Sequence, residues 1–247
     1  MTTLLTHISD LHLDGSSRVR ERTTRTLEYL SSLAQRPDAL LITGDIADNH
    51  TTEEYEEAAA LLDLPFPVLI CPGSHDDRSA FRQHLLGEEP STTPLNRVHD
   101  VAGTAVLVCD STIPGQARGH LDPQTLVWIN HTLEELPPHT PALLAFHHPP
   151  VRVHHPLSDS IGLNNAEDLA GLLHAHPQVA GILVGHAHTG GATTFAGRPL
   201  LLAPAVIRTA TMPWDSERTA AVGQPPGVAF HLIDQDHRLT THFRAVV

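Results

Sequence analysis

The sequence predicts an α/β fold, contained in one domain that spans residues 1–247. In the first three quarters of the chain, short apolar runs alternate with longer segments of helical periodicity, as in βα units. From about residue 191 the pattern changes to successive strands with no helix between them. The 247 residues are enough to bury a sizeable core, and no repeat or low-complexity segment interrupts them.

The expected elements follow from this alternation. Buried strands are predicted for the apolar runs at 3–9, 39–43, 67–71, 105–110, 142–147 and 181–185. Helices are predicted between them, at 18–35, 52–63, 78–86, 122–135 and 164–174. The β-rich C-terminal part is expected to form strands at 191–197, 199–205, 227–234 and 238–246.

Helix starts and long loops complete the expected organisation. Thr51 and Thr52 are candidate N-caps for the second helix, as are Asn164 and Asn165 for the last. Three segments rich in Pro and Gly are predicted to be irregular and long enough to act as functional loops over a site: 87–104, 111–120 and 149–163.

Composition excludes several classes of protein. The formal charge of −13 repels a nucleic-acid backbone or an anionic membrane, so neither is an expected partner. The start, "MTTLLTHISDLHL", lacks the basic region of a signal peptide, and no apolar run reaches the ~20 residues of a membrane span. Cys71 and Cys109 each end an apolar run and are interpreted as small core residues rather than a disulfide. The sequence thus predicts a soluble, cytoplasmic protein.

The 20 histidines are unusual, because histidine is the commonest metal ligand and the usual proton shuttle near neutral pH. Most of them are expected to be surface residues, so position has to identify those that function. Potential metal ligands follow nearly every early strand: Asp10, His12, Asp45, His75, Asp76, His147, His148, His186 and His188. Ligand sites of open α/β sheets collect outside the carboxyl ends of the strands, so we expect one crowded pocket.

Spacing and ligand type support a metal site. Residues i and i+2 of an extended segment point the same way, so Asp10 and His12 can act together, as can His186 and His188. Mixed carboxylate and imidazole ligands suit Mn, Fe, Zn, Co or Ni better than Mg or Ca. The ligands are too many for one ion, which indicates the two-metal site used for phosphoryl displacement. Each motif alone could be a turn or a surface loop; their order at successive strand ends carries the prediction.

The order Asp-x-His, Gly-Asp, Gly-Ser-His-Asp, His and Gly-His-x-His resembles that of the calcineurin-like metallophosphoesterases, with one departure at position 74. The string "GDIADNHTTEEYEEAAALLDLPFPVLICPGSHDD" is most similar to bacterial class III cyclic nucleotide phosphodiesterases and glycerophosphodiesterases, and "HHPP" and "GLNNAEDLAGLL" support the same subgroup. The resemblance implies a four-layer αββα sandwich, in which two mixed sheets pack face to face between outer helices.

The resemblance also implies the roles of the ligands. It assigns the first metal ion to Asp10, His12, Asp45 and His188, and makes Asp45 the bridge to the second. The second ion is assigned to Asp45, His147, His186 and residue 74. His147 is preferred to His148 because the corresponding single histidine of related families stands two residues before the proline.

A reaction follows from these assignments. A hydroxide held between the two metals is the expected nucleophile, because metal coordination lowers the pKa of water to about 7. His75 is expected to face the phosphate, as an acid for the leaving group or as a stabiliser of transition-state charge. Asp76 is expected to orient that imidazole. Asp76 and Asp77 are, alternatively, N-caps of the helix from Arg78.

Ser74 is the departure from the family pattern, which has asparagine there. Its hydroxyl ends one bond nearer the backbone and falls short of an amide oxygen by about 1.5 Å. Three outcomes are open: a water fills the gap, the second ion binds loosely, or the enzyme works with one tightly held ion. We expect a weakened second metal site.

The substrate is expected to be a small phosphodiester. No basic cluster is present to hold a dianion, which favours a compact diester over a monoester. Cyclic nucleotides are favoured, followed by glycerophosphodiesters, and a metal-binding protein that lost turnover through Ser74 is the alternative of another class. Candidates for contacting a base or sugar are Asn49, His50, His154, His155 and Asn165. The loop 87–104 and the part after 191 are apolar enough for a partner surface, and the resemblance implies a homodimer or higher oligomer.

Overall fold

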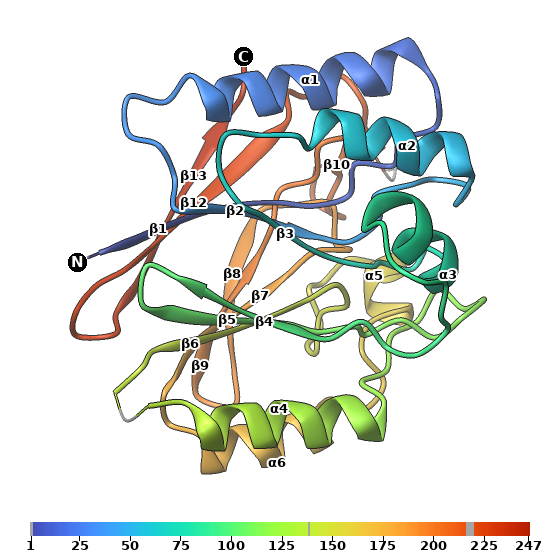
Figure 1. Cartoon of the computed structure of the whole chain (residues 1–247). Helices are drawn as coiled ribbons and strands as arrows, with labels where there is room; N and C mark the ends of the chain where they lie inside the picture. Colours follow the sequence, from blue (N-terminus) through green and yellow to red (C-terminus); the bar gives the residue numbers. More distant parts are fainter. Residues whose placement is uncertain (1, 138, 216–219) are drawn as a thin grey trace.

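Two β-sheets packed face to face form the centre of the molecule, and helices cover both outer faces (Figure 1). We describe residues 2–137, 139–215 and 220–247 of this computed structural model. The five-stranded sheet has the order β13-β12-β1-β2-β3 and the six-stranded sheet the order β4-β5-β6-β7-β9-β8. The αββα sandwich implied by the family resemblance is confirmed.

The five-stranded sheet and its helices come from both ends of the chain. Its strands are β1 Thr3–Ile8, β2 Ala39–Thr43, β3 Val68–Cys71, β12 Gly227–Ile233 and β13 Leu239–Ala245. β1, β2 and β3 are parallel neighbours, whereas β12 pairs antiparallel with both β1 and β13. Its outer face is covered by α1 Ser17–Ser31 and α2 Thr52–Leu61. Thr51 begins α2 with a capping box to Glu54, in agreement with the predicted N-cap.

The middle of the chain forms the six-stranded sheet. Its strands are β4 Arg97–Val101, β5 Thr104–Val108, β6 Ala142–Phe146, β7 Val179–Val184, β8 Gly191–Phe195 and β9 Arg198–Leu202. Its outer face is covered by α4 Pro123–Glu135 and α6 Ala166–Ala175. Two short strands, β10 Thr209–Ala210 and β11 Ala220–Ala221, form a separate ribbon.

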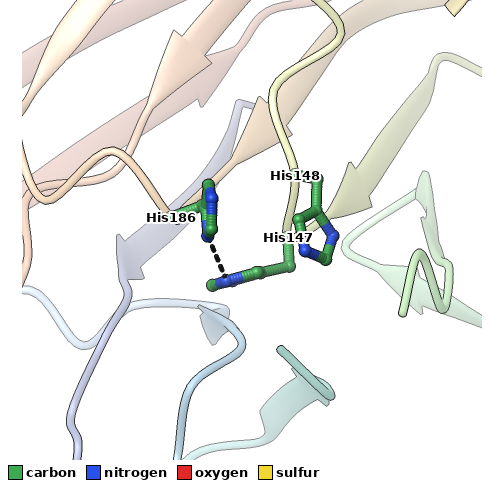
Figure 2. A group of neighbouring side chains, drawn as sticks. All are labelled: His147, His148 and His186. Carbon is green, nitrogen blue, oxygen red and sulfur yellow. Dashed lines mark hydrogen bonds between the residues drawn. The ribbon is translucent and has the colours of Figure 1, made fainter. Parts of the chain in front are cut away.

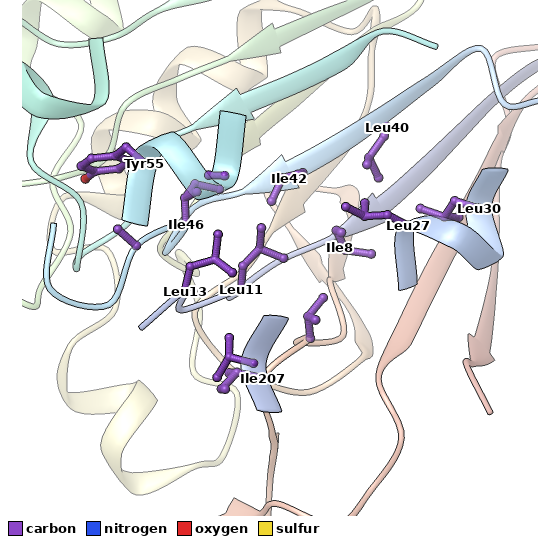
Figure 3. Packing of buried hydrophobic residues seen from close by; sticks show 14 of the residues in the cluster. Ile8, Leu11, Leu13, Leu27, Leu30, Leu40, Ile42, Ile46, Tyr55 and Ile207 are labelled. Atoms are coloured by element: carbon purple, nitrogen blue, oxygen red, sulfur yellow. The ribbon is translucent and has the colours of Figure 1, made fainter. Parts of the chain in front are cut away.

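Alternating side chains of each strand reach two different cores. Leu5 and Leu41 point into the layer between the sheets, where Cys71 and Leu143 also lie. The alternate residues of β1 and β2 point the other way, toward the helices. Figure 3 shows Ile8, Leu40 and Ile42 packed with Leu27 and Leu30 of α1. A strand buried on both faces is largely apolar, which explains why β2, with the sequence "ALLIT", was recognisable as an apolar run, whereas β1 also buries Thr3, Thr6 and His7. Cys71 and Cys109 are buried and free, as expected.

Three local predictions differ from the structure. The loop predicted at 87–104 contains the edge strand β4, in which Val98 and Asp100 are exposed and only Val101 is buried. The segment 149–163 contains a short helix, α5 Pro156–Ser160, begun by His155. The helix predicted at 78–86 is one turn, α3 Arg78–Ala80, followed by a π-helical turn at Phe81–Leu85. Within the described residues no helix is both long and apolar enough to span a membrane.

Candidate metal centre

The ends of β1, β2, β6 and β7 bring most of the predicted ligands together in two groups. The four residues of the first group have potential ligand atoms within 4.8 Å of one another: Asp10, His12, Asp45 and His188. The second group, also within 4.8 Å, consists of His147, His148 and His186 (Figure 2). Convergence of strand ends thus places the predicted aspartate and histidine ligands in two neighbouring groups.

The carboxylate of Asp45 lies between the two groups. Its Oδ2 is 3.4 Å from Nε2 of His12, and its Oδ1 is 3.4 Å from Nε2 of His147. Burial by itself would raise the pKa of Asp45, but the charge and hydrogen bond of His147 and the nearby His12 hold this pKa well below its usual range. Asp45 is therefore ionised and faces nitrogen atoms of both groups at once.

Unpaired buried atoms show that this set of side chains suits a cation. Oδ1 of Asp10 is buried without a hydrogen-bond partner among the described residues, although Nε2 of His188 lies 3.3 Å away. Nε2 of His186 is likewise buried and unpaired. Buried polar atoms of this kind are costly unless a ligand satisfies them. Carboxylate oxygens and imidazole nitrogens are suitable partners for a transition metal.

Two histidines are held so that one ring nitrogen faces the centre. Nδ1 of His147 lies 2.6 Å from the carbonyl oxygen of Thr43, which can only accept, so this nitrogen donates and Nε2 is left toward Asp45. Nδ1 of His12 lies 2.8 Å from Oδ1 of Asp48, which leaves Nε2 of His12 toward Asp45 in the same way. Such contacts orient metal-binding histidines and increase their basicity.

The two adjacent histidines differ in their contacts. Only His147 contacts Asp45, while Nδ1 of His148 lies 2.8 Å from Oγ of Ser111. Figure 2 shows His186 hydrogen-bonded to His147, with His148 beside this pair. The bond joins Nδ1 of His186 to Nε2 of His147, which lie 3.0 Å apart. Nε2 of His148 is buried without a partner among the described residues. This geometry favours His147 as the ligand that shares a metal with Asp45.

The backbone around the centre adopts a conformation that is rare outside glycine. Positive φ angles between 46° and 66° occur at five of the seven predicted metal ligands: Asp10, His12, Asp45, His186 and His188. Each costs of order 1–3 kcal/mol and persists only where its surroundings fix it, as at functional sites. Gly44, at φ 88°, allows the close approach, because a Cβ there would lie 2.7 Å from Nδ1 of His147.

Ser74 sits beside the shared carboxylate. Its Oγ lies 3.4 Å from both Oδ1 and Oδ2 of Asp45, which is longer than an ordinary O–H···O hydrogen bond. Its side chain lines the hollow above the centre together with Asp45 and His186. The hydroxyl therefore faces the ligand groups but makes only a long contact with them.

His75 is held by Asp48 and not by Asp76, which corrects the expected orienting residue. Nδ1 of His75 lies 2.9 Å from the carbonyl oxygen of Asp48 and 3.6 Å from its Oδ1. Nδ1 therefore donates, which leaves Nε2 available. His12, Asp48 and His75 form a third group of potential ligand atoms within 4.8 Å. Asp48 was missed in the sequence, although it follows Asp45 by three residues in "GDIAD" and could have been found there.

Asp76 joins two loops instead. Its carboxylate accepts hydrogen bonds from the backbone N–H groups of Ile46, Ala47 and Gly73, at 2.8–3.1 Å, and from the hydroxyl of Tyr55. Burial and the nearby charge of Asp45 raise the pKa of Asp76 to about 6, against the lowering effect of these donors. Asp76 is therefore a positioning residue for the Asp45 loop. The N-cap of α3 is Asp77, whose side chain accepts from Ser79 and Ala80.

Two hollows meet above the centre. One of about 180 Å³ is lined by four members of the two ligand groups and also by His155, Ser158 and Arg208; the four are His12, Asp45, His186 and His188. A second of about 440 Å³ extends past Asp48 and His50. Both are lined by Ser74, His75 and Ala117, so the half-exposed His75 stands at the boundary between them.

The predicted substrate-binding residues are only partly placed at these hollows. His155 lines the smaller one and His50 the larger. Asn49 bonds through its amide to Glu54 at the start of α2, and Asn165 bonds to both backbone groups of Leu121. His154 is exposed and lines neither hollow. The two asparagines hold helix starts in place. Short polar side chains often form such local hydrogen bonds, which is the alternative to contact with a substrate.

Comparison with known proteins agrees with this geometry. The chain matches the family described as calcineurin-like phosphoesterase over residues 3–190. It is 35% identical, over 220 residues, to a probable cyclic nucleotide phosphodiesterase of Rhodococcus erythropolis; the match covers 83% of this chain and 71% of the relative. A glycerophosphodiester phosphodiesterase, GpdQ, of Enterobacter lignolyticus is 29% identical over 92% of this chain and 86% of its own.

The fold also has solved neighbours. The crystal structure of a dimetal phosphatase from Danio rerio superimposes with a TM-score of 0.67 and 14% sequence identity, covering 99% of both chains. At this identity the likeness concerns the fold alone. It agrees with the two packed sheets and outer helices described above.

Proposed function

Because this chain belongs to the calcineurin-like phosphoesterase family, we propose that it is a phosphodiesterase that uses two metal ions to hydrolyse small phosphodiesters, with cyclic nucleotides as the favoured substrates. One observation carries the proposal: the ionised carboxylate of Asp45 faces His12 on one side and His147 on the other, at 3.4 Å each. A carboxylate between two ligand groups supports this proposal, because it could hold two ions close together, as two-metal hydrolysis needs.

Each ion has its own proposed ligands. The first would be held by Asp10, His12, Asp45 and His188, and the second by Asp45, His147, His186 and a weak contact from Ser74. Mn, Fe, Zn and Co suit this mixture of oxygen and nitrogen ligands. When bound, such ions lower the pKa of water and neutralise charge that develops on the phosphate.

The side chains around the ions have distinct tasks. His75 donates its Nδ1 hydrogen to the carbonyl oxygen of Asp48, so protonation of the leaving oxygen would use the imidazolium form of His75, which carries a second proton on Nε2 and passes it on. Asp48 also fixes the ring of His12 through its carboxylate. Asp76 holds the Asp45 loop through the N–H groups of Ile46 and Ala47.

The size and charge of the pocket favour a compact diester. The hollow over the ligands measures about 180 Å³, which admits a phosphoryl group and its immediate substituents, and the adjoining hollow of about 440 Å³ can take a base or sugar. The net charge of −13 disfavours a polyanionic chain as substrate. The named activity of the relative from Rhodococcus erythropolis supports cyclic nucleotides.

A second candidate is hydrolysis of glycerophosphodiesters, which the named activity of the Enterobacter lignolyticus relative supports. A candidate of another class is a metal-binding protein without turnover, because Ser74 stands 3.4 Å from Asp45 where a stronger ligand is expected.

The test is hydrolysis of bis(p-nitrophenyl) phosphate by protein stripped with a chelator and then reloaded with Mn²⁺, Zn²⁺, Fe²⁺ or Co²⁺. Activity should disappear on stripping and return on reloading. A panel of cyclic nucleotides, glycerophosphodiesters and phosphomonoesters then separates the two enzymatic candidates. Full activity of a metal-free sample would contradict the proposed mechanism, and metal binding without turnover would favour the non-enzymatic alternative.

A further inference from the structure

Arg208 lies at the candidate metal centre, in the segment that joins β9 to β10. It lines the hollow of about 180 Å³ together with His12, Asp45 and His188. Among the described residues that line this hollow, it is the only lysine or arginine. Nothing in the local sequence distinguishes it, since "AVIRTAT" carries no recognisable motif.

The segment that carries Arg208 is fixed on both sides to strands of the metal centre. Before it, the N–H groups of Val206 and Ile207 donate to the carbonyl oxygens of Ser9 and Asp10, at 3.0 and 3.2 Å. After it, the N–H group of Ala210 donates to the carbonyl oxygen of His188 at 2.9 Å. Two of the proposed ligands of the first ion therefore belong to the strand ends that hold Arg208.

Packing makes this placement rigid. Val206 and Ile207 are buried in the core between the five-stranded sheet and its helices, and Figure 3 shows Ile207 near Leu11 and Leu13. Nε of Arg22 donates to the carbonyl oxygen of Val206 at 2.8 Å. The backbone that carries Arg208 is therefore already positioned before a ligand arrives, which reduces the entropic cost of binding.

The guanidinium has no carboxylate partner within 4.0 Å among residues 2–137, 139–215 and 220–247. Arg208 is half-buried, so its charge is only partly screened by water.

We propose that Arg208 binds the non-bridging oxygens of the substrate phosphate and holds the phosphoryl group over the metal centre. The inference rests on the proposed phosphodiesterase function and adds to it a residue that recognises the phosphate by charge. A planar guanidinium can donate two parallel hydrogen bonds to a phosphate, and these charge-assisted bonds are about twice as strong as neutral ones.

The charge of the ligand determines how much Arg208 contributes. A diester carries one negative charge, whereas inorganic phosphate and the monoester product carry two at mildly alkaline pH. Coulomb energy scales with the product of the charges. Removing one positive charge from the pocket should therefore reduce the binding free energy of a dianion about twice as much as that of a monoanion. The affinity loss for the diester is then roughly the square root of the loss for phosphate.

The experiment compares Arg208→Gln with Arg25→Gln in the Mn²⁺-loaded protein. Arg25 is exposed on α1, so its substitution changes net charge equally without touching the pocket. Binding of inorganic phosphate is measured by calorimetry, metal content by elemental analysis, and hydrolysis of bis(p-nitrophenyl) phosphate by kcat/KM. We expect Arg208→Gln to weaken phosphate binding roughly 10- to 100-fold and to lower kcat/KM roughly 3- to 10-fold, with unchanged metal content. Arg208→Lys should recover part of the loss, since it keeps the charge but not the planar pair of donors.

Each outcome bears on one proposal or the other. Equal phosphate affinity in the parent and Arg208→Gln, absence of phosphate binding in the parent, or loss of metal from Arg208→Gln would overturn the role of Arg208. An equal effect of Arg25→Gln would do the same. If the parent hydrolyses no diester but Arg208→Gln still weakens phosphate binding, the proposed activity fails while the phosphate-binding role stands.

Discussion

Gly73 offers a direct test of how far the position of Asp45 controls the metal centre. A Cβ at residue 73 would overlap the backbone nitrogen and Oδ1 of Asp45 and would lie 2.9 Å from its Cγ. Ordinary Cβ contacts lie at 3.4 Å or more. Gly73→Ala therefore has to displace the shared carboxylate, by at least about 0.5 Å at Cγ and by more at Oδ1, and the hydrogen bond from the N–H group of His75 to Oδ1 is disturbed as well.

A displacement approaching 1 Å at a reacting centre can cost about 100-fold in rate. We therefore expect Gly73→Ala to lower kcat for bis(p-nitrophenyl) phosphate about 100-fold and to raise the metal concentration for half-maximal activity about 10- to 100-fold. The assay is turnover over a Mn²⁺ titration, with metal content measured on the same samples.

Gly171→Ala is the matched control. Gly171 lies in α6, is exposed, and would place its Cβ within 4 Å of no other residue. The control should keep turnover and metal requirement and gain up to about 1 kcal/mol in free energy of unfolding, because alanine is the better helix former. If Gly73→Ala matched the parent in turnover and metal requirement, the carboxylate position would not govern the centre, and the two-metal interpretation of Asp45 would be refuted.

The remaining predictions concern three other side chains. Ser74→Asn should place an amide oxygen where the hydroxyl makes only a long contact, and so lower the metal concentration for half-maximal activity about 10- to 100-fold. The effect on the rate at saturating metal should be smaller. Identical metal titration curves for the parent and the variant would show that residue 74 does not control the proposed second ion. His75→Ala should lower turnover about 10²–10⁴-fold with nearly unchanged metal content, and loss of a metal would instead make His75 a ligand. Burial lowers the pKa of His231 from 6.5 to about 3, so its stabilising contribution is complete above pH 6.5 and is lost as the pH falls toward 3. The free energy of unfolding should accordingly decrease by up to about 1.4 kcal/mol per pH unit below pH 6.5 on account of this residue. Denaturation of His231→Gln should show a shallower slope, and parallel profiles would contradict the assignment.

The local pattern of the chain was sufficient for most of the architecture. β2 is buried on both faces, so its apolar run was visible without knowledge of its neighbours. Edge strand β4 was missed because "RVHDV" contains three polar residues and buries only its last valine, so it resembles a loop until the partner β5 is known. The apolar run that predicts a strand arises from burial, and burial is incomplete at the edge of a sheet.

The order of ligands at strand ends, together with the rule that such ends gather at one edge of a sheet, was enough to predict that Asp10, Asp45 and His188 lie together. Contacts between loops were not predictable in this way. The contact between Asp48 and His75 became visible only once the path of the loop after β2 was known. Asp76 is next to His75 in the chain, but its carboxylate accepts hydrogen bonds from the backbone N–H groups of residues 46 and 47. Arg208 reaches the same pocket because the N–H group of Ile207 donates a hydrogen bond to the carbonyl oxygen of Asp10, a residue nearly two hundred positions earlier in the chain. Strand spacing is a local property written in the sequence, whereas the direction of a loop side chain depends on which distant backbone groups its segment finds, and only the tertiary structure decides that.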